Sequence, residues 1–131
     1  MLAVELEAWE IDGDPAAIER AVLNVLDNAI KFSPRGSTVR IGLTQGVLTV
    51  ADSGPGILAA EQDRVFDRFW RSPAARPLPG SGLGLAIVAD VIARHGGTVS
   101  ASSAPDGGAV ISLKLPGTFP ETLPGGLPRV R

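Results

Sequence analysis

A glycine cluster at residues 80–85 runs directly into an apolar pattern with helical spacing. Gly80, Gly82 and Gly84 allow positive φ angles and let a backbone approach a ligand closely. The following helix would direct its unpaired N–H groups and the positive end of its dipole at this loop. The segment therefore favours an anion such as a phosphate, although small-residue turns also precede helices for purely structural reasons.

The spacing of this cluster excludes two familiar phosphate loops. A Walker loop needs a Lys-Ser or Lys-Thr pair after its last glycine, and the chain has none there. A dinucleotide fingerprint needs a glycine where Leu85 stands. Other residues must therefore identify the ligand.

A second cluster lies on a helix that the apolar spacing predicts for residues 15–32. Because a helix advances about 100° per residue, Asn24, Asn28 and Lys31 fall on one polar stripe beside the apolar face. Asparagine is mildly unfavourable inside a helix, so two of them one turn apart need a reason. The stripe is either a solvated polar face or a set of amide oxygens and an ammonium that bind a metal-bound polyphosphate.

A third cluster, residues 52–57, follows a pattern typical of a buried strand. An ionised carboxylate only accepts hydrogen bonds, so Asp52 suits an exocyclic amine such as that of adenine and would repel the carbonyl of guanine. Gly54 and Gly56 would bring the backbone close to the bound group. The structural alternative is that Asp52 stabilises an Asx turn.

Residues 61–79 combine aromatic residues with a run rich in Pro and Ala. The aromatic part is expected to pack a short helix on the core, whereas residues 72–79 cannot form regular structure and are predicted to be a lid. Arg68, Arg71 and Arg76 either reach phosphates when the lid closes or are solvated loop charges.

The composition sets broad limits on the molecule. A chain of 131 residues predicts one domain, and a net charge of −2 argues against a general binder of nucleic acids or membrane surfaces. The absence of cysteine excludes disulfides and thiol-ligated metals.

Apolar periodicity predicts one sheet and its helices. The expected elements, in chain order, are a strand from residue 2 to 9 or 11, a helix at 15–32, a hairpin of 39–43 and 47–51, a helix at 85–95 and a hairpin of 98–102 and 109–115. Residues 117–131 are expected to form a disordered tail, because they are rich in Pro and Gly and poor in apolar residues.

Four segments stand in a fixed order, and with them the chain resembles the catalytic, ATP-binding domain of a sensor histidine kinase. Residues 24–32 match that family's asparagine box, 52–56 its first glycine box, 66–69 its phenylalanine box and 80–85 its last glycine box. The resemblance covers residues 1–116. It implies a two-layer α/β (α+β) sandwich, in which three helices cover one face of a mixed sheet of about five strands.

The resemblance also implies ATP and Mg²⁺ as cofactors. Asn24, Asn28 and Lys31 would be catalytic: Asn28 would bind Mg²⁺, with Asn24 a possible second ligand, and Lys31 would hold the phosphates. Asp52 would recognise adenine. The ATP-binding residues expected in this way are Asn28, Lys31, Asp52, Gly54, Gly56, Ile57, Phe69, Arg71, Arg76, Gly80, Ser81, Gly82, Leu83, Gly84 and Leu85.

One residue bears on the acceptor of the phosphoryl group. Gyrase, mismatch-repair ATPases and other superfamily members carry a glutamate where Asn24 stands. A neutral asparagine cannot take a proton from water or serine, whereas an imidazole nitrogen needs no such base, so we expect a histidine acceptor. His95 is the only histidine and is expected to cap a helix C-terminus.

The resemblance places the acceptor on a dimerisation hairpin that normally precedes this domain, so we expect an excised catalytic domain. Its partners would be ATP, that hairpin and the receiver domain of a response regulator, with no nucleic acid. We expect the isolated domain to be monomeric and to be the cytoplasmic part of a membrane-anchored kinase. A gyrase-like ATPase and a non-catalytic nucleotide-binding module remain the alternatives.

Overall fold

The computed structural model describes residues 1–67, 84–105 and 107–120. The elements are, in chain order, β1 (Leu2–Leu6), α1 (Pro15–Phe32), β2 (Val39–Thr44), β3 (Val47–Ala51), a short 3₁₀ helix η1 (Ala59–Glu61), α2 (Gly84–Arg94), β4 (Thr98–Ser103) and β5 (Ala109–Lys114).

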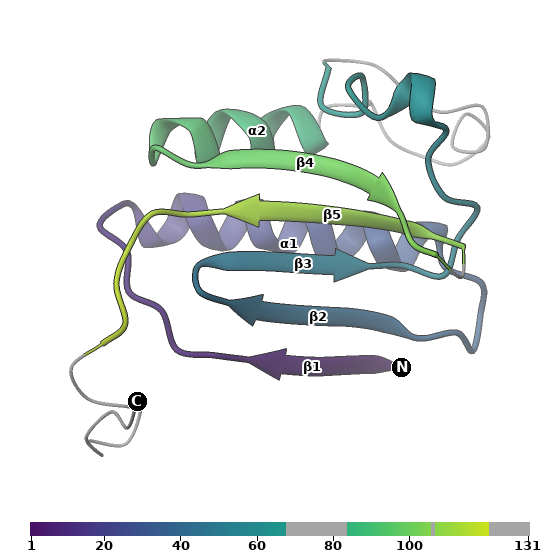
Figure 1. Cartoon of the computed structure of the whole chain (residues 1–131), viewed down its shortest axis with the longest axis horizontal. Coiled ribbons are helices and arrows are strands. Elements are labelled where there is room, and N and C mark those ends of the chain that lie inside the picture. Colours follow the sequence, from purple (N-terminus) through teal and green to yellow (C-terminus); the bar gives the residue numbers. More distant parts are fainter. Residues whose placement is uncertain (68–83, 106, 121–131) are drawn as a thin grey trace.

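The strands form one five-stranded sheet in the order β1-β2-β3-β5-β4 (Figure 1). β1 and β2 are parallel, with α1 in the connection between them, and every other neighbouring pair is antiparallel. The β2–β3 hairpin turns at Gln45 and Gly46, whose φ angles of 50° and 80° suit the right-handed twist of paired strands. The predicted mixed sheet is confirmed.

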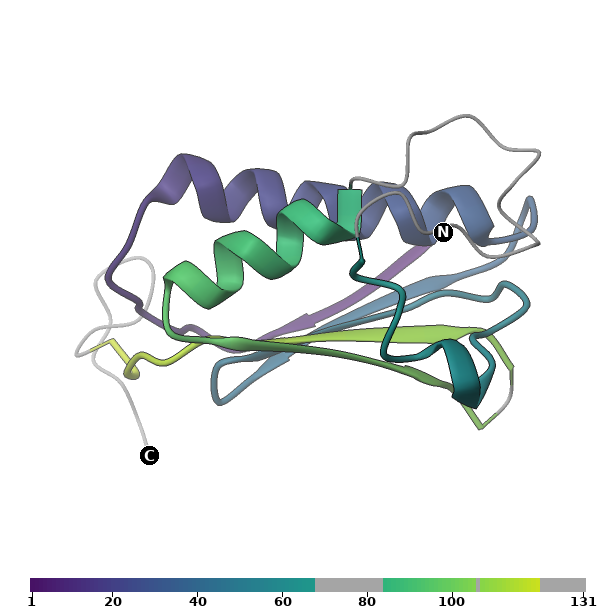
Figure 2. The ribbon, with the colours of Figure 1, turned by 90° about the horizontal axis from the view of Figure 1, so that it is seen from above.

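Both α-helices pack on one face of the sheet, which gives the expected two layers (Figure 2). Asp14 begins α1, because its Oδ1 accepts hydrogen bonds from the N–H groups of Ala16 and Ala17 at 3.1 and 3.3 Å. The core lies between the layers and its largest fully buried side chains are Ile92, Leu113, Val25, Val50 and Val88.

His95 connects the C-terminal end of α2 to the N-terminal end of α1. Its Nδ1 lies 2.7 Å from the carbonyl oxygen of Val91 in the last turn of α2, and its Nε2 accepts the N–H of Asp14 at 3.0 Å. A side chain at Gly13 would overlap the imidazole ring. His95 therefore holds the end of α2 against the start of α1, a structural role in line with the expected cap.

The third helix was expected within residues 61–79, and only part of that range belongs to the described residues. They contain two α-helices and η1, and residues 62–67 form turns that bury Val65 and pack Phe66 against the core. The residue before η1, Leu58, supplies no side-chain cap. So short an uncapped helix gains too few hydrogen bonds to offset the entropy of nucleation.

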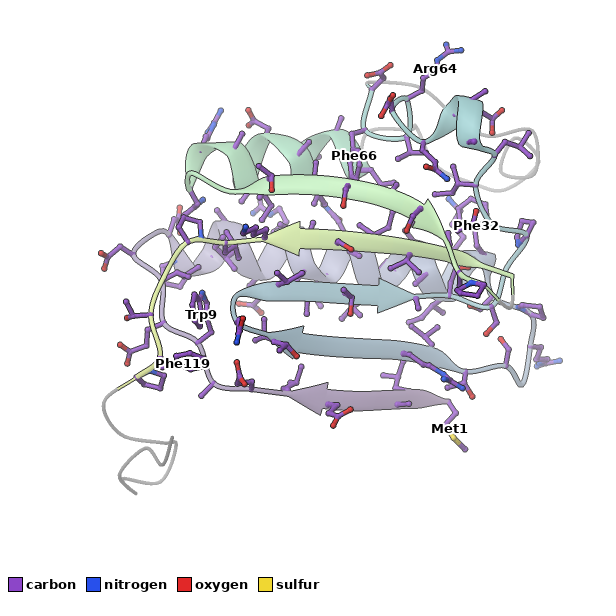
Figure 3. All side chains as sticks on the ribbon, in the orientation of Figure 1. Met1, Trp9, Phe32, Arg64, Phe66 and Phe119 are labelled. Carbon is purple, nitrogen blue, oxygen red and sulfur yellow. The ribbon has the colours of Figure 1, made fainter. Side chains whose placement is uncertain are left out.

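β1 ends at Leu6, earlier than predicted, because the chain beyond it turns toward the C-terminal segment. Trp9 donates its Nε1–H to the carbonyl of Leu115 at 3.1 Å and packs edge-to-face on Phe119, with ring centroids 5.1 Å apart (Figure 3).

Four residues of the predicted tail are also ordered. Glu10 and Thr118 exchange two backbone hydrogen bonds of 2.8 and 2.9 Å, and Pro120 is buried. These contacts join the start of the predicted tail to the segment after β1. Residues 121–131 lie outside the described part of the chain.

Candidate functional site

Helix α1 presents the asparagine pair beside its buried face. Ala21, Val25 and Ala29 are buried against the core, and Asn24 and Asn28 lie half-buried on the flank of that stripe. No described residue forms a hydrogen bond with either side-chain amide, and none of their polar atoms is both buried and unpartnered. Both amides can therefore exchange water for a ligand without breaking a bond within the described fold. Lys31 is exposed in the last turn of the same helix.

Asp52 stands directly after β3 and is held by backbone groups from two directions. It is 8% exposed, and its Oδ1 accepts the N–H of Gly54 at 2.8 Å and the N–H of Ala109 at 2.9 Å. Hydrogen bonds of a charged acceptor are roughly twice as strong as neutral ones, so the carboxylate has a fixed orientation. No described residue donates to Oδ2, which leaves that oxygen as an acceptor for a ligand.

The loop after Asp52 is fastened to the end of α1. Ser53 donates its N–H to the Oγ of Ser33 at 3.1 Å and its hydroxyl to the carbonyl of Thr38 at 2.7 Å. A Cβ at Gly54 would lie 2.6 Å from the carbonyl oxygen of Phe32. Only glycine therefore lets the loop pass this close to the helix that carries the asparagines.

The same loop is also fastened to β4. The Oγ of Ser103 accepts the N–H of Ile57 at 3.0 Å and donates to the carbonyl of Ile57 at 2.7 Å. Gly56 has a φ of 82°, and a Cβ there would lie 3.1 Å from the carbonyl oxygen of Gly108. Hydrogen bonds from Ser33 on one side and Ser103 on the other thus hold the backbone of residues 53–57 in one conformation.

Helix α2 begins at Gly84, the last of the three predicted cradle glycines. Gly84 is exposed and a Cβ there would meet nothing within 4 Å, whereas Leu85 is half-buried and packs against the core. α1 and α2 run in opposite directions, so the C-terminus of α1, the N-terminus of α2 and the end of β3 lie at one end of the molecule (Figures 1 and 2). A helix N-terminus at this place carries N–H groups that suit an anion.

The structure describes nine of the predicted site residues, which lie in the C-terminal half of α1, in the loop after β3 and at the start of α2. These are Asn24, Asn28, Lys31, Asp52, Gly54, Gly56, Ile57, Gly84 and Leu85. The other predicted contacts lie outside the described residues and are Phe69, Arg71, Arg76, Gly80, Ser81, Gly82 and Leu83.

Sequence reasoning missed the residues that position Asp52. Ala109 was expected only to begin a strand and Gly108 only to belong to the turn before it, yet the N–H of Ala109 binds the carboxylate. Gly108 has a φ of 84°, and a Cβ there would overlap the carbonyl of Asp52. The Gly-Gly pair at 107–108 was the available signal, because glycine permits a positive φ and a close approach of the backbone, and Gly108 has both.

The donor set at this end of the molecule fits a hard cation shared with phosphates. The described residues contain no group of three or more His, Cys, Asp or Glu that could hold a metal by themselves. Mg²⁺ needs few protein oxygens, because it keeps several waters and is completed by substrate phosphates. Two uncharged amide oxygens on α1 match that requirement, and a transition-metal site of imidazoles or thiolates does not.

Neither α-helix in the described part of the chain has the length and apolar character of a membrane-spanning segment.

Comparison with known proteins agrees with this architecture. Residues 13–118 match the model of the histidine kinase-, DNA gyrase B- and HSP90-like ATPase family. This is most of the chain, and the chain belongs to that family.

Individual relatives are histidine kinases. The chain is 49% identical over 128 residues to the signal transduction histidine-protein kinase/phosphatase MprB of Mycobacterium sp. (strain KMS), a match that covers 93% of this chain. It spans about a quarter of the length of that relative, 24%.

Solved structures of histidine kinases share the fold. A mycobacterial sensor histidine kinase MprB superposes with a TM-score of 0.83 at 43% identity, covering 91% of this chain and 83% of that one. Full-length ShkA in complex with AMPPNP superposes with a TM-score of 0.72 at 28% identity, covering 91% of this chain and 26% of that one. The chain is therefore a domain of the histidine kinase type, with a mixed α/β sandwich.

Proposed function

We propose that this chain binds Mg-ATP and donates the γ-phosphoryl group to a histidine on the dimerisation hairpin of a sensor kinase, as an ATP:protein-histidine phosphotransferase. The observation that carries this proposal is the fixed carboxylate of Asp52. Two backbone N–H groups hold its Oδ1, so Oδ2 can accept the exocyclic amine of adenine at a defined position. Guanine presents a carbonyl oxygen there, which the carboxylate repels.

The phosphate end of the nucleotide would lie between the two helices. With adenine at Asp52, the phosphates would run along the flank of α1 that carries Asn28 and Lys31, toward the N-terminus of α2. Asn28, with Asn24 as a second donor, would hold Mg²⁺ through its amide oxygen. When bound, the ion offsets the negative charge that spreads over the transferring phosphoryl group. The predicted contacts within residues 69–83 would complete the cradle.

The chain's own residues would act mainly by positioning. In the transfer, the lone pair of an imidazole nitrogen forms a bond to the γ-phosphorus, the bond to the bridging oxygen breaks, and ADP leaves with that electron pair. The imidazole then loses its N–H proton to solvent. No protein base is needed, which suits a neutral amide at Asn24.

His95 is a poor candidate for the acceptor. Both of its ring nitrogens are engaged, one with Val91 and one with Asp14. It also lies at the C-terminal end of α2, whereas the candidate site lies at the N-terminal end (Figure 2). These contacts support the proposal that the acceptor is supplied from outside this chain.

The relatives support the same assignment. The curated match is called a histidine-protein kinase/phosphatase, and the ShkA structure was determined with AMPPNP, a nonhydrolysable ATP analogue. By this likeness we propose a response regulator receiver domain as the downstream partner and no nucleic acid partner. We further propose that the chain is the cytoplasmic catalytic part of a membrane-anchored kinase.

Calorimetric titration of the purified chain with ATP and GTP, each with and without Mg²⁺, tests the binding step. We expect binding of ATP in preference to GTP, strengthened by Mg²⁺, with negligible phosphate release in the same samples. Sustained hydrolysis would instead identify a gyrase-like ATPase. Absence of ATP binding would refute the proposed function.

A second assay tests the transfer. The chain is mixed with γ-labelled ATP and a separately purified dimerisation hairpin from the mycobacterial relative, and label on the hairpin is followed at acid and alkaline pH. Phosphohistidine is labile in acid and stable in alkali, so the expected label survives alkali only. Bound ATP without any labelled hairpin would favour the non-catalytic module.

A further inference from the structure

Strand β1 forms an open edge of the sheet and exposes an apolar row. Leu2, Val4 and Leu6 are 52%, 55% and 61% exposed, although they point to the same side as the core residues of β2. Their register partners Val39, Ile41 and Leu43 all contact the core. The main contacts of the helices with the sheet lie elsewhere, α1 on β3 and α2 on β4, and β1 lies beyond them at the edge of the sheet (Figure 1). A row of apolar side chains thus continues past the edge of the helix layer.

The backbone N–H and C=O groups of Leu2, Val4 and Leu6 point away from β2. The carbonyl of Met1 accepts the N–H of Val39, and the N–H of Glu7 donates to the carbonyl of Leu43. Backbone groups alternate in direction along a strand, so those of residues 1, 3, 5 and 7 point toward β2. Those of Leu2, Val4 and Leu6 point outward, to the free edge. The residues 2–6 include no proline, lysine or bulge, the features by which edge strands usually resist pairing.

This edge is complementary to itself. In an antiparallel pair with the two-fold axis at Val4, residue 2 of one copy faces residue 6 of the other, and Val4 faces Val4. All of these positions have outward backbone groups, so each pair can exchange two hydrogen bonds. The one charged side chain of the strand, Glu5, then faces Ala3 of the second copy and not a like charge.

We propose that β1 is a self-association surface, through which two copies of this chain join their sheets in an antiparallel β1–β1 pair. The dimer is isologous, because the same strand contributes to both sides. Five residues per copy make a small interface, so the association is weak and concentration-dependent, with a dissociation constant of about 10–1,000 μM. The proposed dimer differs from the expectation that the isolated domain is monomeric.

Sedimentation equilibrium of the chain over about 10 μM to 1 mM tests the dimer. Val4→Lys places two ammonium groups opposite each other on the two-fold axis and removes apolar contact, so we expect the dissociation constant to rise at least about tenfold. Leu58→Lys is the matched control, because Leu58 is 69% exposed and follows Ile57, which is hydrogen-bonded to Ser103 of β4 at the opposite edge of the sheet from β1. It should leave the dissociation constant unchanged.

Two variants at Ala3 test the pairing itself. Ala3→Lys would face Glu5 of the second copy in both symmetric pairs and should strengthen the dimer, whereas Ala3→Glu should weaken it, each by about 2- to 30-fold. General stickiness of apolar residues would not reverse with the sign of this charge. Circular dichroism at low concentration shows that both variants fold.

A wild-type chain that stays monomeric over the whole range would overturn the proposal. So would a dimer that Val4→Lys and Leu58→Lys weaken equally, or one in which the two Ala3 variants shift the dissociation constant in the same direction. Because β1 lies at the opposite edge of the sheet from β4 and carries none of the proposed nucleotide contacts, these outcomes are independent of ATP binding.

Discussion

The variant Asp52→Asn tests the proposed adenine contact with the least change in shape. Oδ1 of the wild type accepts two backbone N–H groups, so the asparagine must keep its amide oxygen in that place. Its NH₂ group then replaces Oδ2. A donor now faces the exocyclic amine of adenine, which is itself a donor, and the hydrogen bond is lost.

The expected size of the effect follows from this geometry. Loss of one hydrogen bond in a site that leaves the partner donor unpaired costs about 1–3 kcal/mol, so ATP should bind about 5- to 150-fold more weakly. The NH₂ group can instead donate to the carbonyl of guanine. The preference for ATP over GTP should therefore fall by a larger factor than the affinity for ATP.

The fold should survive this substitution. Both backbone hydrogen bonds remain but lose their charge assistance, which is worth about 1 kcal/mol each. Removing a buried charge also removes its desolvation penalty, so the free energy of unfolding should fall by less than about 2 kcal/mol. Urea unfolding measures this change independently of the nucleotide.

Calorimetry with ATP and GTP is the assay, and Asp90→Asn is the control. Asp90 is exposed and pairs with Arg94 at 3.0 Å on α2, so the same chemical change there should leave both affinities unaltered. A folded Asp52→Asn protein with wild-type affinity for ATP and an unchanged preference over GTP would refute the adenine contact. In that case Asp52 serves only to fasten the loop to β5.

Three further predictions address the proposed Mg²⁺ ligand Asn28, the glycine pair in the β4–β5 turn, and the contact of His95 between α1 and α2. Asn28→Ala should remove most of the Mg²⁺ dependence of ATP binding and leave binding of metal-free ATP nearly unchanged, measured by calorimetry with Mg²⁺ and with EDTA; equal losses under both conditions would place the ion elsewhere. Gly108→Ala should lower the free energy of unfolding, measured in urea, by more than about 2 kcal/mol, because its Cβ would overlap Asp52 and its φ is positive. Gly107→Ala should lower it by only about 1–2 kcal/mol, because nothing lies within 4 Å of a Cβ there. Equal effects of the two variants would show that the overlap at Gly108 is relieved freely. His95→Ala should lower the free energy of unfolding by about 1–2 kcal/mol through two lost hydrogen bonds and leave ATP affinity unchanged, and a larger effect on binding than on stability would contradict its purely structural role.

Local chemistry along the chain was sufficient to predict several elements and their site residues. Asp14 and Pro15 begin α1 where capping preferences predict, and the apolar period of that helix places Asn24 and Asn28 beside its buried face. Both hairpins and the start of α2 also follow from local patterns. These features depend on neighbours a few residues away, and the spacing of residue types along the chain indicates such local interactions.

Distant contacts decided the rest. Among the described residues, Val65 and Phe66 are packed on the core by turns, and residues 118 and 119 contact Glu10 and Trp9. Asp52 and the N–H of Ala109 are 57 residues apart in sequence, and no local pattern connects them.

The sequence by itself determined the fold class, the element order and which residue types could bind a metal-bound nucleotide. Only the tertiary structure decided that Asp52 has one fixed oxygen, that Ser33 and Ser103 fasten its loop on both sides, and that β1 is an open edge. The reason is physical. Periodicity records which side of an element is buried, whereas the choice of the neighbouring strand, and of the groups that hydrogen-bond across it, is made by the packing of the whole domain.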